Sequence, residues 1–106
     1  MGRMRQELGL THYNLGVLQM KAGDYEQAVK EFKFSVLLNP NDALAHYNLG
    51  FIYDSQLKDL DSAIYHYSNY VRLMPNARDR NEVEAQLLRL RLRKETGVEG
   101  VLRMSK

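Results

Sequence analysis

The chain has 106 residues, 44% of them hydrophobic and 26% charged, with a formal net charge of +2. This composition is typical of soluble globular proteins, and the length allows one hydrophobic core. The absence of cysteine excludes disulfide bonds, thiolate metal sites and thiol catalysis. No apolar run approaches the roughly 20 residues of a membrane helix, and the first residues lack the apolar stretch of a secretory signal. Cytoplasm is therefore the default compartment.

The N-terminal part of the chain predicts a helical hairpin. Apolar residues at helical spacing indicate a first helix that ends near Lys21, and residues 1–8 are expected to extend it at its N-terminus. A break at residues 22–24 precedes a second helical pattern, which Pro40 ends because proline cannot continue a helix. The side chains of Asn41 and Asp42 can then cap the next helix at Ala43.

Small residues are expected where the two helices of this hairpin approach each other. Gly16 and Ala28 are small, whereas Leu15 and Phe32 are large enough to fill the space beside them.

A second hairpin repeats the first at a fixed distance along the chain. The five residues from His12 to Gly16 recur from His46 to Gly50, displaced by 34 residues. Thirteen positions separate Gly50 from Ala63, against twelve between Gly16 and Ala28, so the turn at residues 56–59 is expected to be longer.

These landmarks resemble two consecutive tetratricopeptide repeats. The family pattern corresponds in the first copy to His12, Leu15, Gly16, Gln19, Ala28, Phe32 and Pro40. In the second copy it corresponds to His46, Leu49, Gly50, Tyr53, Ala63, Tyr67 and Pro75. The resemblance implies an all-α fold, a right-handed α-α superhelix of two helical hairpins, with repeat 1 at residues 9–42 and repeat 2 at residues 43–77.

The C-terminal part predicts one more helix. Within residues 78–96, Val83, Leu87 and Leu90 share one stripe among charged residues, as in a capping helix that covers the last repeat. Residues 88–93 also alternate apolar and basic side chains, a strand pattern that we reject because no partner strand is predicted. Residues 97–106 are expected to form a flexible tail.

The resemblance implies a peptide-binding groove lined by the first helix of each hairpin. The corresponding residues are Leu10, Tyr13, Asn14, Val17 and Lys21 in the first copy, and Leu44, Tyr47, Asn48, Phe51 and Ser55 in the second. Tyr13 with Val17, and Tyr47 with Phe51, are four residues apart and can share a helix face. The expected function is that of a scaffold or adaptor module that binds a peptide or helix with hydrophobic side chains.

Structural roles compete with ligand binding at four of these positions. Tyr13 and Tyr47 can instead fill the contact between neighbouring first helices, and Asn14 and Asn48 can instead fix the backbone geometry between repeats. One subgroup of the family clamps the C-terminal carboxylate of chaperones with Lys, Asn and Arg side chains. Only Asn48 matches that set, so this chain is not expected to act as such a clamp.

The sequence indicates neither an enzyme nor a metal site, and no cofactor is expected. His12 and His46 stand at equivalent repeat positions, which favours packing roles over a shared metal ion. His66 is interpreted as a surface imidazole, and the cluster of Tyr65, Tyr67 and Tyr70 as core and groove lining.

Two further partners are considered from the sequence. Met4, Leu8 and Leu10 can mediate a homodimer through the N-terminal open end, because two repeats with one capping helix fall short of the three repeats that are usually stable alone. As an alternative function, Arg89, Arg91, Arg93 and Lys94 can bind nucleic acid or an anionic surface. Residues 78–106 carry eight basic against five acidic residues, so the basic excess lies in this part of the chain.

Overall fold

The computed structural model describes residues 2–96, which form a row of helices. In chain order these are α1 (Gly2–Lys21), α2 (Tyr25–Leu38), α3 (Ala43–Ile52), the π-helix η1 (Tyr53–Leu57), α4 (Leu60–Leu73) and α5 (Arg80–Thr96). Within the described residues there is no strand, which confirms the all-α fold of paired helices. The expected flexible tail at residues 97–106 lies outside them.

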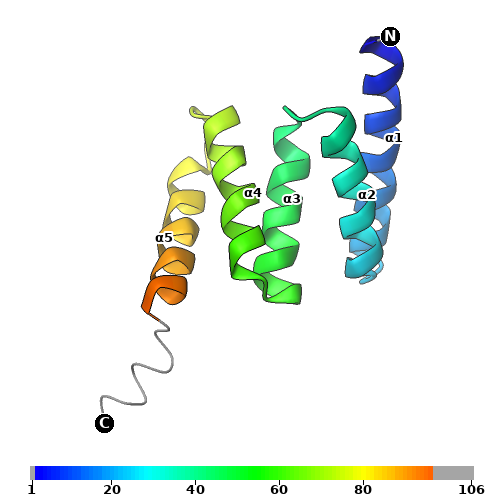
Figure 1. Cartoon of the computed structure of the whole chain (residues 1–106). Coiled ribbons are helices and arrows are strands. Elements are labelled where there is room, and N and C mark those ends of the chain that lie inside the picture. The colour runs from blue at the N-terminus through cyan, green and yellow to red at the C-terminus, as the bar shows by residue number, and fades with distance from the viewer. Residues whose placement is uncertain (1, 97–106) are drawn as a thin grey trace.

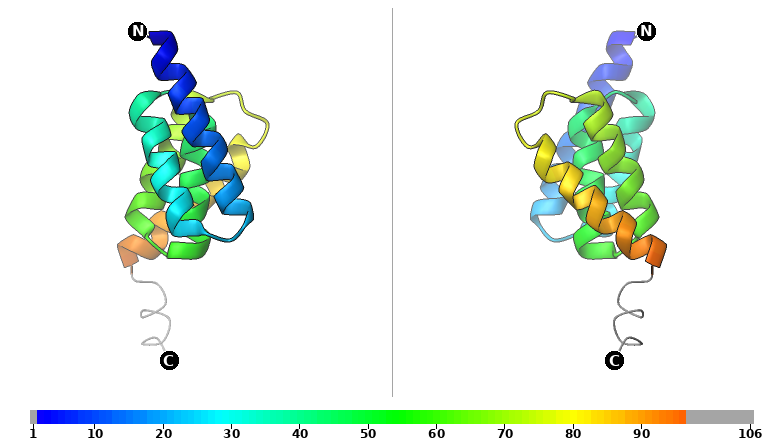
Figure 2. Two further views of the ribbon diagram at one scale, coloured as in Figure 1. Left: turned by 90° about the vertical axis from the view of Figure 1, so that its right-hand side faces the viewer. Right: turned by 90° about the vertical axis from the view of Figure 1, so that its left-hand side faces the viewer.

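The helices stand side by side in the order of the sequence, with α1 at one end of the row and α5 at the other (Figure 1). The pairs α1–α2 and α3–α4 are the two predicted hairpins, and α1 crosses α2 at an angle (Figure 2). Each inner helix has a neighbour on both sides in this row, whereas α1 and α5 stand at its two ends, next to α2 and α4 (Figure 1). The two end helices therefore each keep one unpartnered face.

Aspartate side chains begin three of the helices. Asp24, Asp42 and Asp59 each accept a hydrogen bond from a backbone N–H three residues later, at 3.4, 3.2 and 3.1 Å. Such caps satisfy N–H groups that have no partner inside the helix. The predicted cap before Ala43 is confirmed, and Asp42 provides it.

Gly16 meets Phe32 as predicted, and the equivalent glycine of the second hairpin also meets a large ring. A Cβ atom on Gly16 would lie 2.8 Å from the Phe32 ring, and one on Gly50 would lie 2.7 Å from the Tyr67 ring. The prediction for Leu15 is wrong, because this side chain is 40% exposed and fills no space beside Gly16.

The prediction of a longer second turn is also wrong. Only Lys58 and Asp59 lie between η1 and α4, whereas three residues lie between α1 and α2. The extra residue is accommodated in η1, where the wider π-helical turn lengthens the end of α3. Lys58 then closes the turn in the left-handed conformation, with φ of 58°.

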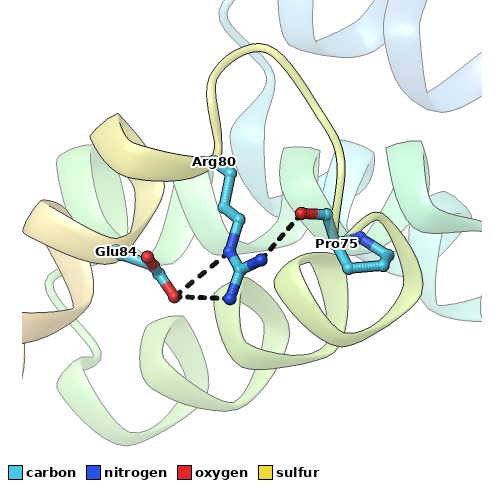
Figure 3. A network of polar contacts seen from close by, with 3 residues as sticks. All are labelled: Pro75, Arg80 and Glu84. Carbon is cyan, nitrogen blue, oxygen red and sulfur yellow. Dashed lines mark hydrogen bonds and ion pairs between the residues drawn. The ribbon is translucent and has the colours of Figure 1, made fainter.

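The capping helix α5 covers α4 with the predicted stripe, because Val83, Leu87 and Leu90 are all buried. The turn before it is held by Arg80, which donates to the Pro75 carbonyl at 2.8 Å and to the Glu84 carboxylate at 3.3 Å (Figure 3). These bonds link the end of α4 to the first turn of α5.

Candidate functional site

The face predicted to form a groove comes from α1, α3 and η1. Of the ten predicted residues, the half-buried ones are Tyr13, Val17, Tyr47, Asn48 and Ser55, and the exposed ones are Leu10, Asn14, Lys21, Leu44 and Phe51. Successive residues of an α-helix are about 100° apart, so the predicted residues of each helix share one face. The structure thus presents a mixed apolar and polar face that solvent can reach.

One hydrogen bond joins the two repeats within this face. The side-chain amide of Asn48 donates to the hydroxyl of Tyr13 at 3.4 Å, and the Tyr13 ring lies 5.6 Å from the Phe32 ring. This favours the packing role considered for Tyr13 and the geometric role considered for Asn48.

Tyr47 lies at the centre of an aromatic cluster. Its ring centroid is 5.8 Å from that of Tyr67 and 5.1 Å from that of Tyr70, and all three rings are tilted. Burial raises the pKa of the Tyr47 hydroxyl, and the nearby carboxylates of Asp79 and Glu82 raise it further. The Tyr47 ring therefore packs against two core tyrosines, and the rest of its side chain lies on the predicted groove face.

Tyr65 departs from the prediction for the tyrosine cluster. Tyr67 and Tyr70 are buried, but Tyr65 is exposed and packs edge-on against His66. It contributes to neither the core nor the predicted groove.

The start of α5 and the residue before it add a wall beside Tyr47 that the predicted groove residues do not include. A small pocket of about 100 Å³ is lined by Tyr47, Tyr67, Asp79, Glu82, Val83 and Gln86. The Tyr70 hydroxyl donates to Asp79 at 2.6 Å, which raises the pKa of Tyr70 to about 12. A further shift of 34 residues, plus the one extra residue of the second copy, leads from Asn48 to Val83, so the repeat period contained the signal.

Some apolar side chains of the predicted groove are exposed to solvent. Leu44 and Phe51 of α3 lie seven residues apart, two helical turns, and project from the same face. Ser55 is less available, because its hydroxyl donates to the Phe51 carbonyl at 2.7 Å.

The interpretation of His66 as a surface residue is wrong. His66 and His46 are only 7% and 5% exposed, and their Nδ1 atoms are 3.0 Å apart. Nε2 of His46 is 3.0 Å from the Pro40 carbonyl, which can only accept, so this nitrogen carries the proton. In neutral His46, Nδ1 is then an acceptor, and His66 donates to it.

His12, the equivalent of His46 in the first repeat, has different partners. Its Nδ1 is 2.6 Å from the Glu31 carboxylate and its ring stacks on Phe34 at 5.0 Å. Among residues 2–96 no group of three or more His, Asp or Glu side chains could hold a metal ion.

The basic residues of α5 do not gather into one surface. Arg89 pairs with Asp54 at 2.8 Å, Arg91 donates to Ser68 at 3.1 Å, and Lys94 pairs with Asp61 at 2.6 Å. At about 100° per residue, Arg89 and Arg91 point to sides of the helix roughly 160° apart. This distribution disfavours the alternative of a basic surface for nucleic acid.

Comparison with known proteins gives one match. Residues 19–56 match a family model described as a TPR repeat, which spans α2, α3 and most of η1. No curated protein and no solved structure matches the chain. None of the helices in residues 2–96 has the length and apolar character needed to cross a membrane.

Proposed function

We propose that this chain, a member of the tetratricopeptide repeat family, is a scaffold or adaptor module that binds a peptide or helix in its groove. Repeats of this family generally mediate protein–protein interactions. The observation that carries this proposal is the exposed face of α3, where Leu44 and Phe51 project beside the partly buried Tyr47. Rigid aromatic and aliphatic side chains of this kind supply most of the binding energy at protein interfaces.

The electrostatics of the groove support a ligand other than a C-terminal carboxylate. Asp79 and Glu82 place two carboxylates in the pocket beside Tyr47. A bound carboxylate there would be desolvated next to like charges, which is unfavourable. We therefore propose that the groove is not a chaperone-carboxylate clamp.

We propose a binding rather than a catalytic function, and a role without cofactor. The hydrogen bonds of the buried histidine pair stay within the protein, since His66 donates to His46 and His46 donates to the Pro40 carbonyl. With both rings almost fully buried, no substrate can reach either nitrogen. The cytoplasmic location stays a prediction.

We expect the double substitution Leu44→Ala and Phe51→Ala to weaken binding of groove ligands at least about tenfold, because each removes an exposed apolar anchor. Suitable probes are peptides selected from a random phage-displayed library against the intact chain. Their affinity for each variant can be measured by fluorescence anisotropy.

The matched control is the double substitution Leu88→Ala and Tyr65→Ala, which removes two exposed apolar side chains from α5 and α4. Circular dichroism should show native helix content in both variants. Selected peptides that bind the Leu44 and Phe51 variant as tightly as the original chain would disprove the groove assignment.

The N-terminal open end is a second contact surface, at which we propose that two copies of the chain form a homodimer. A specific apolar surface of α1 supports this proposal.

A further inference from the structure

The outward face of α1 carries an apolar stripe with the spacing of a coiled coil. Met4, Leu8, Leu15 and Leu18, with Thr11 between them, follow alternating steps of four and three residues. This spacing keeps side chains on one seam of a helix. The four apolar side chains are between 40% and 68% exposed.

In the second repeat, the residues equivalent to this stripe pack against a neighbouring helix. A shift of 34 residues takes Leu15 to Leu49 and Leu18 to Ile52, and both of these residues are fully buried. Helix α3 lies between α2 and α4, whereas α1 has no helix on its outer side (Figure 1). The stripe is therefore a helix-packing surface whose partner helix is missing.

The apolar surface continues from α1 onto α2. His12 stacks on Phe34 at 5.0 Å, and Phe34 and its neighbour Leu37 are both more than half exposed. Six large apolar side chains that are each about half exposed present on the order of 500 Å² of apolar surface. A standard interface takes about 800 Å² from each partner, so this surface supplies most of one.

We propose that the stripe binds the same stripe of a second copy, with the two α1 helices antiparallel around a twofold axis near Thr11. Met4 and Leu18 lie seven residues on either side of Thr11, so each would face the other across the axis. In such a twofold-symmetric interface the same surface of each copy contacts the other, so assembly stops at the dimer.

Charge distribution selects the antiparallel orientation. Arg3 and Arg5 are both exposed near the N-terminus of α1. A parallel pair would bring four arginines together, whereas an antiparallel pair separates them by most of the helix length. The antiparallel arrangement also opposes the two helix dipoles.

This dimer goes beyond the groove function and does not depend on it. Leu10, which the sequence grouped with Met4 and Leu8, lies two residues after Leu8 and so about 200° around the helix from it. That grouping is wrong, because Leu10 shares the groove face with Val17. The groove face stays accessible when the stripe is covered.

Sedimentation equilibrium of the intact chain tests the dimer. We expect a monomer–dimer equilibrium at micromolar concentrations, weakened at least about tenfold by the double substitution Leu8→Glu and Leu15→Glu. The control Leu88→Glu changes an exposed leucine on α5 and should leave the equilibrium unchanged. Purely monomeric behaviour at high micromolar concentration, or dissociation by the control instead, would overturn the proposal.

Cysteine cross-linking tests the orientation, on a background that contains no cysteine. Under mild oxidation we expect Thr11→Cys to form a disulfide-linked dimer. Met4→Cys alone should remain unlinked, but a mixture of Met4→Cys and Leu18→Cys should link. Linkage of Met4→Cys with itself would indicate parallel helices, and no linkage of Thr11→Cys would indicate a different surface; either result overturns the antiparallel dimer.

Discussion

Acidification from about pH 7 to about pH 4.5 is expected to lower the free energy of unfolding by about 2 kcal/mol, because His66 is buried in its neutral form. Burial, together with the smaller effects of His46 and Lys33, lowers the pKa of His66 from 6.5 to about 4. The pKa of His46 is also lowered, mainly by burial, although the Pro40 carbonyl and Asp42 oppose the shift.

The sign of this effect follows from which state binds protons first. Both histidines have a lower pKa in the folded chain than in the unfolded chain, so the unfolded chain takes up protons first as the pH falls. The contribution of the two histidines to the free energy of unfolding is therefore largely present above about pH 6.5 and is lost as the pH falls toward 4. Protonation also turns Nδ1 of His46 into a donor that faces another donor, which breaks the bond with His66.

Chemical denaturation at a series of pH values checks this prediction. The substitution His66→Gln should flatten most of the pH dependence, because a neutral amide replaces the titrating ring. His12→Gln is the matched control, since His12 lies outside the buried pair. Equal stability of the unmodified chain at the two pH values would contradict the proposed burial of the neutral pair.

The substitution Gly50→Ala is expected to destabilise the fold by about 2 kcal/mol, even though alanine is the better helix former. Its Cβ atom would lie 2.7 Å from the Tyr67 ring, well inside van der Waals contact. Tyr67 is 2% exposed and packs against Tyr47, so its ring has no space into which to move. Thermal unfolding should show a drop in Tm on the order of 10 °C.

Gly9→Ala provides the matched control for this prediction. Its Cβ atom would meet the end of the Asn39 side chain, which is flexible and only partly buried. We expect Gly9→Ala to change stability by less than about 1 kcal/mol, because Asn39 can rotate away. If the two substitutions have the same effect, close packing against Tyr67 is not the reason for glycine at position 50.

The candidate site was only partly predictable. The repeat period located the inward face of α1 and α3, because equivalent positions in a repeat have equivalent orientations. It did not reveal that Tyr13 is bonded to Asn48, or that Asp79 is bonded to Tyr70. The first contact depends on the distance between helices 35 residues apart in the sequence, and the second on the path of the loop between α4 and α5.

Local structure in this chain could be predicted from the order of its residues. The 34-residue period, the aspartate caps, Pro40 and the small residues Gly16 and Gly50 specify hairpins, because each acts through backbone geometry or through steric contact within one hairpin. The environment of equivalent residues, in contrast, depends on how the helices pack. Leu15 and Leu49 occupy the same place in the same motif, yet one is 40% exposed and the other fully buried. The difference arises because burial depends on the neighbouring helix, and α1 has none on its outer side.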